Sequence, residues 1–380
     1  MNSSKKLIYI VNLRLPTEKA YGIQIIKTCE SLADFGHDVL LVCPFRKNNI
    51  KDDFFDYYGV KRNFKFKKIW SPDFYWPGAL DKVAVFLKNT ISALGLAFYA
   101  LKQKADIIYS RDELPLYFLS FFRKNIVFEA HRYSSKRKFF YQRFKNTGTK
   151  TVVISEAIKK EFLKLGFNEK NILIAPDGVD LEKFDLSISK EEARKKVGLL
   201  FGKKIVMYTG HLFPWKGVDI LAEAAQLLQD VDFIFIGGTE YDIQKFKNKY
   251  QKVKNIKILG HKPHKEVPIY LKAADILVLP NSAKEEISSK YTSPLKLFEY
   301  MASGRPIVAS DLLSTREVLN ESNSVLVKPD NPEALVEGIK SALANAKLAE
   351  KISDQALKDV QDHTWRKRAE KIITYSALSS

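Results

Sequence analysis

Apolar residues recur along this chain in two patterns, as short continuous runs and as longer runs with an apolar residue every three or four positions. The short runs, such as residues 5–12 and 38–43, predict buried strands. The longer runs, such as residues 23–35, predict amphipathic helices. Because the two kinds alternate and glycine or proline often separates them, the pattern predicts βα units in a parallel sheet.

The same alternation begins again in the second half of the chain. Four apolar runs predict its strands: residues 204–209, 233–236, 256–259 and 276–280. Glycine follows the first three of these runs, at Gly210, Gly237 and Gly260. The carboxyl ends of parallel strands meet at one edge of a sheet, and glycine-rich loops there bring backbone N–H groups close to a phosphate. We therefore expect a phosphate-binding edge in this half.

These patterns predict an α/β protein with two doubly wound parallel-sheet domains that face each other across a cleft. The first domain takes residues 1–187 and the second takes residues 188–362. The tail, residues 363–380, contains a further helical pattern. Since both cores are complete before this tail, we expect its helix to cross back and pack on the first domain.

The segment TSPLKLFEYMASGRPIVASD, residues 292–311, predicts a loop, a helix, a tight turn and the strand 306–309. Ser293 suits the N-cap, Pro294 the first helical position and Gly304 the C′ position. Glu299 falls in the second turn, so its carboxylate could point toward the helix N-terminus, where free N–H groups favour an anion. This arrangement suits a ligand with both a phosphate and hydroxyls. A surface glutamate on an ordinary amphipathic helix is the alternative.

Three other residues stand where parallel sheets collect ligand-binding groups. Gly22 lies in the predicted loop after the first strand, and His131 follows the predicted strand 125–129. Lys216 precedes a predicted helix, where a cation could hold phosphate. The imidazole of His131 could take or give a proton near neutral pH. The alternatives are a turn glycine and a histidine that satisfies a loop.

The composition is that of a soluble globular protein, with 46% hydrophobic and 28% charged residues in a chain of 380. Cys29 and Cys43 fall in a predicted helix and a predicted strand, which suits buried thiols in a reducing compartment. The first apolar run is short and continues into a strand pattern, unlike a signal peptide. We expect a cytoplasmic protein.

The formal net charge of +18 favours anionic partners, which include nucleic acid, phosphorylated substrates and an acidic membrane surface. No zinc-finger, homeodomain or RNP pattern is present, so we expect no nucleic-acid partner. Basic and aromatic residues alternate between Arg132 and Lys145, which suits peripheral contact with an anionic membrane. A solvated basic helix with one buried aromatic face explains that segment nearly as well.

Residues 80–101 form a long and mostly apolar helical pattern. Its uncharged part, residues 89–101, is too short to cross a bilayer. The segment predicts either a core helix or a partly exposed helix that touches lipid, and the core helix is the more ordinary case.

Several kinds of site are not indicated. His261 and His264 are near each other in sequence, but no cysteine or carboxylate cluster accompanies them, so we expect no metal site. A Walker motif, a nucleophile elbow and a full GxGxxG are absent from the sequence. These absences argue against an NTPase, a hydrolase and a dehydrogenase.

A series of segments carries a family resemblance that covers nearly the whole chain. In order they are AYGIQ, GHDV, EAH, VVISEAIKKEF, IAPDGVDLEKF, YTGHLFPWKGVDIL, ILGHKP, AADILVLP, SPLKLFEYMASGRPIVASD and HTWRKRAEKI. By their order and spacing, the chain resembles retaining nucleotide-sugar glycosyltransferases of glycosyltransferase family 4. The resemblance implies the GT-B fold, with an acceptor-binding first Rossmann-like domain and a donor-binding second one.

The resemblance also implies roles for individual residues. Lys216, in the KG motif, would hold the donor diphosphate, and Glu299 would bind the ribose hydroxyls. His131 would lie at the reacting face of the sugar, and with Lys216 and Glu299 it forms the expected catalytic set. The other expected donor-binding residues are Gly22 and Gly210 near the phosphates and His261 and Lys262 near the base. Ser293, Pro294 and Leu295 also belong to this set, because they occupy the place where backbone amides usually meet the phosphate or sugar.

Two positions depart from the family pattern. His211 stands where the family often has arginine after the glycine, so part of the diphosphate charge would be neutralised less firmly or only when this histidine is protonated. Tyr291 replaces the first glutamate of the family's pair, which usually contacts the sugar. Glu285 and Glu286 are close in sequence to Tyr291, but nothing in the sequence shows that either substitutes.

The expected function is transfer of a sugar from a UDP- or GDP-linked donor to a glycan or lipid-linked glycan, with retention of the anomeric configuration, as in polysaccharide biosynthesis. No cofactor or metal is expected, since Lys216 and helix N-termini would stabilise the leaving diphosphate. The alternatives are a catalytically inactive sugar-nucleotide or polyanion binding protein and a nucleotide-sugar epimerase on the same fold.

Overall fold

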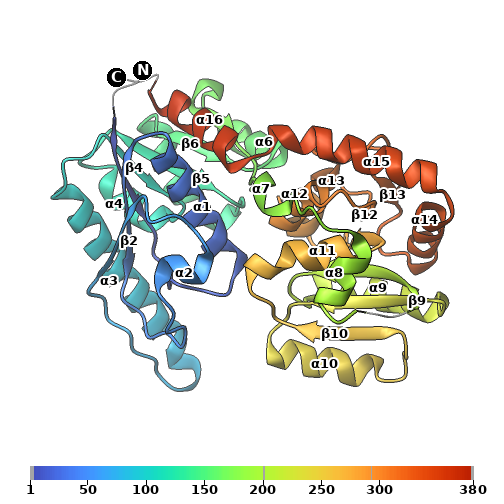
Figure 1. The fold of residues 1–380 in the computed structure, drawn as a ribbon. Helices are drawn as coiled ribbons and strands as arrows, with labels where there is room; N and C mark the ends of the chain where they lie inside the picture. The colour runs from blue at the N-terminus through green and yellow to red at the C-terminus, as the bar shows by residue number, and fades with distance from the viewer. Residues whose placement is uncertain (1–3, 200–201, 292, 378–380) are drawn as a thin grey trace. The chain divides into compact units, whose positions relative to one another are not determined.

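The computed structural model describes residues 4–199, 202–291 and 293–377, which form two compact units (Figure 1). The first unit comprises Met1–Pro176 and Trp365–Ser380, and the second comprises Asp177–Thr364. Val179 and Phe184 lie in the core of the second unit. Residues 177–187, which the sequence pattern places at the end of the first domain, therefore pack with the second.

The first unit is built on a seven-stranded parallel sheet with the strand order β3-β2-β1-β4-β5-β6-β7. Its strands are β1 (Lys6–Ile10), β2 (Asp38–Pro44), β3 (Lys65–Ile69), β4 (Ile107–Ser110), β5 (Ile126–Ala130), β6 (Lys150–Val153) and β7 (Ile172–Ile174). Its helices are α1 (Ala20–Asp34), α2 (Phe54–Tyr58), α3 (Asp81–Leu101), α4 (Glu113–Leu119), α5 (Lys138–Asn146), α6 (Glu156–Lys164) and α16 (Trp365–Ala377). In the middle of the sheet, Ile8 pairs with Leu40 on one side and with Ile108 on the other.

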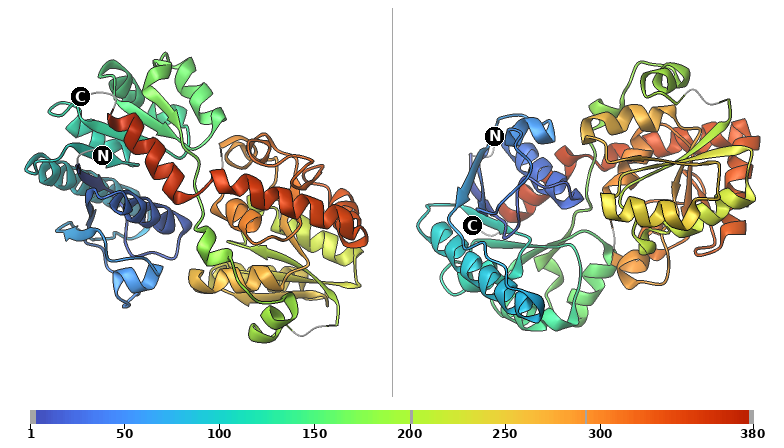
Figure 2. Two further views of the ribbon diagram at one scale, coloured as in Figure 1. Left: turned by 45° about the horizontal axis from the view of Figure 1, so that its top comes forward. Right: turned by 90° about the horizontal axis from the view of Figure 1, so that it is seen from below.

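The C-terminal helix belongs to the first unit, as predicted. Figure 2 shows α16 alongside α1. Ala369, Ile372 and Ile373 of α16 pack in the same core as Ile25 and Cys29 of α1. This burial of apolar surface explains why the tail returns to the first sheet.

Helix α3 turns mostly small residues toward the protein and several large apolar residues outward. Ala93, Ala97 and Ala100 are buried, whereas Phe86 and Phe98 are 68% and 59% exposed. Gly78–Leu101 has the length and hydropathy of a membrane-spanning segment, but less than half of it is buried inside the unit. The expectation of an ordinary core helix is therefore wrong for its outer face.

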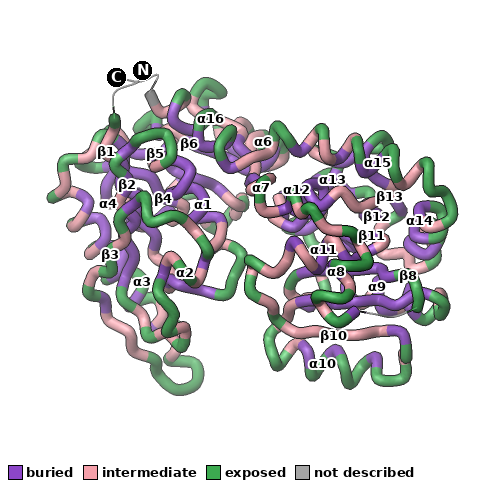
Figure 3. The backbone as a smooth tube through the Cα atoms, in the orientation of Figure 1, coloured by how far each residue is buried: buried purple, intermediate pink, exposed green. Residues whose placement is uncertain are grey.

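The second unit contains a six-stranded parallel sheet with the strand order β10-β9-β8-β11-β12-β13. Its strands are β8 (Lys204–Thr209), β9 (Val231–Ile236), β10 (Ile256–Gly260), β11 (Ile276–Leu279), β12 (Ile307–Ser310) and β13 (Val325–Val327). Its helices are α7 (Leu181–Phe184), α8 (Lys190–Lys196), α9 (Val218–Leu227), α10 (Glu240–Tyr250), α11 (Val267–Ala273), α12 (Leu295–Ala302), α13 (Leu313–Arg316), α14 (Pro332–Ala344) and α15 (Ala346–Asp359). The central strands of both sheets are buried (Figure 3). Two Rossmann-like parallel sheets are thus present, as predicted.

Helix α12 begins later than predicted. Pro294 is its N-cap, with extended backbone angles (φ −76°, ψ 127°), and Leu295 is the first helical residue. Ser293 is then one position too early to cap the helix, and its hydroxyl has no partner among the residues described. Thr292 lies outside the described residues. The predicted end is confirmed, since Gly304 follows the C-cap with φ +66°, and the next strand, β12, starts at Ile307.

Candidate functional site

The loops that follow β8, β9 and β10 pass one another closely at the carboxyl edge of the second sheet. The Gly237 amide donates to the Gly260 carbonyl at 2.7 Å, and the Gly210 amide donates to the Ile236 carbonyl at 2.8 Å. A Cβ atom on Gly237 would lie 2.4 Å from the Gly210 carbonyl oxygen. Only glycine fits there, so these residues let backbone stand where side chains would otherwise block the edge.

Lys216 lies at this edge, at the end of the 3₁₀ turn Pro214–Lys216. The next residue, Gly217, has φ +74° and is the N-cap of α9, and a Cβ atom there would lie 1.7 Å from the Pro280 carbonyl oxygen. The Lys216 ammonium lies 3.9 Å from the centroid of the Trp215 ring. Burial lowers the pKa of Lys216 to about 8. No other described residue accepts a hydrogen bond from it, so the lysine offers its charge to a ligand.

Glu299 faces His264, to which the sequence analysis assigns no role in the donor site. The Oε1 atom of this buried carboxylate lies 2.6 Å from Nε2 of His264. His264 begins the 3₁₀ turn His264–Glu266, which follows β10. His261 is exposed, and Lys262 lies over the Tyr270 ring at 5.7 Å. The strand after which a base-binding loop was expected therefore also supplies a partner that orients Glu299.

Lys296 is a second residue to which the sequence analysis assigns no role in the donor site. It lies on α12 and is 9% exposed. Its Nζ atom is 3.8 Å from the centroid of the Tyr208 ring and would be 3.7 Å from a Cβ atom on Gly210. Four residues later on the same helix face, the Tyr300 hydroxyl accepts a hydrogen bond from the Thr209 amide at 2.8 Å. This face of α12 is thereby fixed against the end of β8.

The structure also shows the surroundings of His211, Tyr291 and Pro294, three further residues expected to bind the donor. The His211 ring stacks on Phe213, with centroids 4.9 Å apart, and its carbonyl accepts a hydrogen bond from the Tyr208 hydroxyl at 2.7 Å. Tyr291 is buried at the end of the π-helix Ile287–Tyr291. Pro294 has no N–H, so its backbone cannot donate a hydrogen bond to a ligand.

Leu295 keeps its N–H at the first position of α12, where helix geometry leaves that group without an intrahelical partner. Glu286 forms an exposed ion pair with Lys290 at 2.8 Å. Glu286 is therefore engaged at the surface, and it does not substitute for the family glutamate that Tyr291 replaces.

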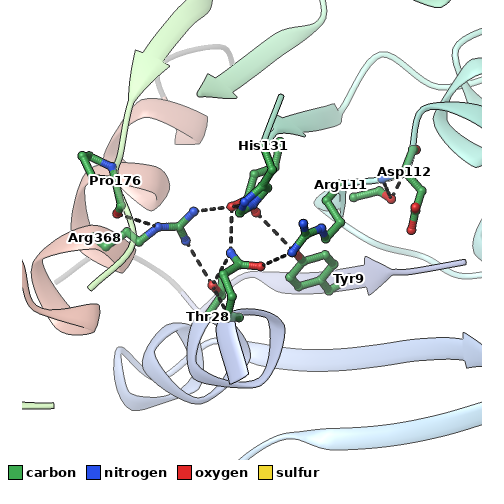
Figure 4. A network of polar contacts seen from close by, with 10 residues as sticks. Tyr9, Thr28, Arg111, Asp112, His131, Pro176 and Arg368 are labelled. Atoms are coloured by element: carbon green, nitrogen blue, oxygen red, sulfur yellow. Dashed lines mark hydrogen bonds and ion pairs between the residues drawn. The ribbon is translucent and has the colours of Figure 1, made fainter. Parts of the chain in front are cut away.

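In the first unit, His131 belongs to a buried polar network (Figure 4). Its Nε2 atom lies 2.8 Å from Oε1 of Glu129, the fully buried fourth residue of β5. The same oxygen accepts hydrogen bonds from Gln24 at 2.8 Å and from Arg368 of α16. Burial alone would raise the pKa of Glu129, but Arg368 and His131 hold it well below its ordinary value.

This network fixes the orientation of the His131 ring. Glu129 is held as an anion by Arg368, and its Oε1 lies within hydrogen-bond distance of Nε2 of His131. The EAH motif is therefore more than a strand end with a histidine, since its glutamate orients the ring.

Gly22 does not lie in a loop, contrary to prediction. It is in the first turn of α1, because the helix starts at Ala20. A Cβ atom at this position would lie 2.5 Å from the Tyr58 hydroxyl and 2.7 Å from Cγ2 of Thr17. Close packing within the first unit already explains the absence of a side chain here.

Sequence profiles of known families match both halves of the chain. The profile "Glycosyltransferase Family 4" matches residues 22–183, and "Glycosyl transferases group 1" matches residues 189–359. The chain belongs to glycosyltransferase family 4. It is therefore a nucleotide-sugar glycosyltransferase of a retaining family, with the GT-B fold.

Individual relatives of this family 4 enzyme are distant in sequence. A Bacillus subtilis protein described as the teichuronic acid biosynthesis glycosyltransferase TuaC is 23% identical over 334 residues, which is 82% of each chain. The Escherichia coli UDP-Gal:alpha-D-GlcNAc-diphosphoundecaprenol alpha-1,3-galactosyltransferase is 29% identical over 44% of each chain. The crystal structure of Anabaena HepE with UDP and glucose superimposes with a TM-score of 0.73 at 17% identity, covering 99% of this chain and 100% of that one.

Proposed function

We propose that this family 4 glycosyltransferase moves a sugar from a UDP- or GDP-linked donor to a glycan or lipid-linked glycan acceptor and needs no metal. The observation that carries the proposal is the composition of the second sheet's carboxyl edge. There Lys216 has no hydrogen-bond acceptor among the residues that the structure describes, and His264 orients the buried carboxylate of Glu299. A nucleoside diphosphate has both an anion for the lysine and vicinal hydroxyls for the carboxylate.

The residues of this chain divide the chemistry between them. Lys216 stabilises the charge that develops on the leaving diphosphate, which is the task a metal performs in other transferases. Glu299 accepts hydrogen bonds from the ribose. In a front-face displacement, the leaving phosphate takes the proton of the acceptor hydroxyl, so no protein nucleophile is required. His131 is assigned to the reacting face of the sugar, because it matches the family histidine and Glu129 orients its ring.

The proposed donor and acceptor are chosen by the similarity of this chain to proteins whose names state a nucleotide or an acceptor. UDP is the first nucleotide to test, because both HepE and the E. coli relative are named with it. A lipid-linked acceptor is the first to test, because the E. coli relative acts on a sugar carried by diphosphoundecaprenol.

A membrane-carried acceptor requires the enzyme to reach the membrane, and the outer face of α3 suits this task. Val83, Phe86, Leu94 and Phe98 expose large apolar side chains on this one helix. Contiguous exposed apolar surface of this kind marks an interaction site. Together with the net charge of +18, it supports peripheral docking on the anionic inner face of the cytoplasmic membrane.

The basic segment 132–145 contributes less than its sequence indicates. Arg137 forms an ion pair with Glu113, and Arg143 donates to the Ser120 hydroxyl at 2.9 Å. Both arginines are therefore engaged inside the unit. Lys136 and Phe139 are exposed and stay available to a membrane surface.

A transfer assay tests the proposed function. The protein is incubated with UDP- and GDP-sugars and a prenyl-diphosphate-linked sugar, with and without EDTA, and the linkage is read by NMR. We expect a retained anomeric configuration and a rate that EDTA does not change. Binding without turnover would favour the inactive binding protein, and conversion of the donor sugar without transfer would favour the epimerase.

A further inference from the structure

Lys296 occupies a position that is unfavourable for a lysine in the unliganded protein. Its ammonium is buried, and no hydrogen-bond acceptor reaches it from any residue that the structure describes. Burying a charged group without a partner costs several kcal/mol, and a buried amine usually finds a carboxylate or a carbonyl. Here the contact is the face of the Tyr208 ring at 3.8 Å, which attracts a cation only weakly.

The charged neighbours of Lys296 do not provide the hydrogen-bond acceptor that its ammonium lacks. Glu299 lies near enough to attract it, but that carboxylate already has His264 at 2.6 Å. Lys216 lies near enough to repel it, and burial and this repulsion lower the pKa of Lys296 well below its ordinary value. Two lysines thus share one edge of the sheet without a shared protein anion. Such a pair is suited to a ligand that carries at least two negative charges.

The backbone beside Lys296 is open in the way an anion requires. Gly210 has φ +130°, and a side chain there would stand 3.7 Å from the Lys296 ammonium. Because Gly210 has no side chain, the ammonium borders the glycine loop after β8. Tyr300, one turn further along α12, anchors the helix to Thr209, so Lys296 is held at the loop rather than reaching it from a flexible stem.

We propose that Lys296 is a second cation for the donor diphosphate and supplies, from α12, the positive charge that His211 does not supply from the loop. The inference rests on the proposed function and names one more residue of the same site. The His211 ring stacks on Phe213, whereas the Lys296 ammonium borders Gly210 and has no hydrogen-bond acceptor among the described residues. Lys216 and Lys296 together then bind the two phosphates.

Calorimetry with UDP and UMP on the Lys296→Met variant tests this role. A charge-assisted contact is worth about 1.5–3 kcal/mol, so UDP affinity should fall by roughly 10- to 100-fold while UMP affinity changes much less. Lys340→Met removes an exposed lysine of α14 and should change neither. Equal losses for both nucleotides, or none, would overturn the proposal for Lys296. If the parent protein binds no nucleoside diphosphate, the proposed function itself fails.

The stability of the same variant separates a ligand-binding lysine from a structural one. Removing a buried cation that lacks a partner should raise the melting temperature of the unliganded protein, whereas removing a structural lysine should lower it. A lower melting temperature for Lys296→Met than for the parent would contradict the proposal.

Mass spectrometry on the unmodified parent provides a measurement that does not depend on a variant's folding. Reductive methylation should label the buried Lys296 more slowly than an exposed lysine such as Lys340, and UDP should slow the labelling of Lys296 further than UMP does. An amine that is never labelled, or labelled equally with and without UDP, would overturn the assignment.

Discussion

Replacement of Arg368 by methionine tests how the C-terminal helix supports His131. Arg368 is 4% exposed, and it donates to Glu129, to the Thr28 hydroxyl at 3.0 Å and to the Pro176 carbonyl at 3.1 Å. Methionine has a similar length but no donor. Glu129, which is 0% exposed, would keep Gln24 and His131 as partners but lose its permanent cation.

The expected cost follows from the burial of this pair. Removing one partner of a buried ion pair costs about 3–5 kcal/mol, because the other charge is left uncompensated. For a unit of this size, each kcal/mol lowers the melting temperature by about 2–4 °C, so we expect a decrease of roughly 6–20 °C. Arg366→Met on the same helix removes an exposed arginine and should change the free energy of unfolding by less than about 0.5 kcal/mol.

The pH dependence gives the prediction its sign. The pKa of Glu129 is lower in the folded protein than the ~4.3 of an unfolded chain, so its contribution to stability is present above that value and is lost as the pH falls below it. In Arg368→Met, Glu129 stays buried but loses the interaction that lowers its pKa most, so the pKa of Glu129 should rise. The deficit of the variant should therefore shrink as the pH falls from 7 toward 4.

Urea unfolding of the parent and both variants across this pH range, with hydrogen exchange of β5 and α16 to localise the loss, measures the effect. A deficit below about 1 kcal/mol at pH 7, or one that does not change with pH, would refute the reasoning from the buried pair.

Three further outcomes are expected. UDP affinity should fall as the pH rises through about 8, because Lys216 then loses its proton while the terminal phosphate, with a pKa of ~6, is already ionised. If calorimetry shows the same UDP affinity across this pH range, Lys216 does not bind the diphosphate. His131→Ala should lower kcat by roughly 100-fold or more with little change in nucleotide affinity, and unchanged kcat would make this histidine structural. The double variant Phe86→Glu/Phe98→Glu should no longer float with anionic vesicles, whereas Leu313→Glu, which changes an equally exposed residue of the second unit, should still do so. Equal binding of the parent to neutral and anionic vesicles would contradict electrostatic docking.

The sequence predicts the fold well because hydrophobic periodicity dominates both sheets. Strands β8, β9 and β11 are short apolar runs bounded by glycine or proline, and burial on both faces leaves no other structure for them. The end of α12 is predicted because the position after the helix takes a left-handed backbone, which glycine adopts without steric cost, as Gly304 does. Its start is missed because the extended Pro294 moves the N-cap by one position.

The candidate site is predicted only in part, since some of its contacts join elements that are distant in sequence. His264 reaches Glu299 across 35 positions, and Arg368 reaches Glu129 across 239. No local pattern encodes such pairs. Lys296 did carry a signal, because a lysine four positions before Tyr300 interrupts an otherwise apolar helix face. A lysine at such a position either buries its ammonium or extends its side chain to the solvent, and only the packing of α12 on β8 decides between the two.

The central claim is that the carboxyl edge of the second sheet holds the donor nucleotide, with the diphosphate on Lys216 and the ribose on Glu299. Calorimetry of Lys216→Ala and Glu299→Ala with UDP, UMP and 2′-deoxy-UDP tests it most directly. Each variant should lose roughly 10- to 100-fold in UDP affinity. Lys216→Ala should also discriminate less between UDP and UMP, and Glu299→Ala should discriminate less between UDP and 2′-deoxy-UDP. Parent-like affinities in both folded variants would contradict the placement of the donor at this edge.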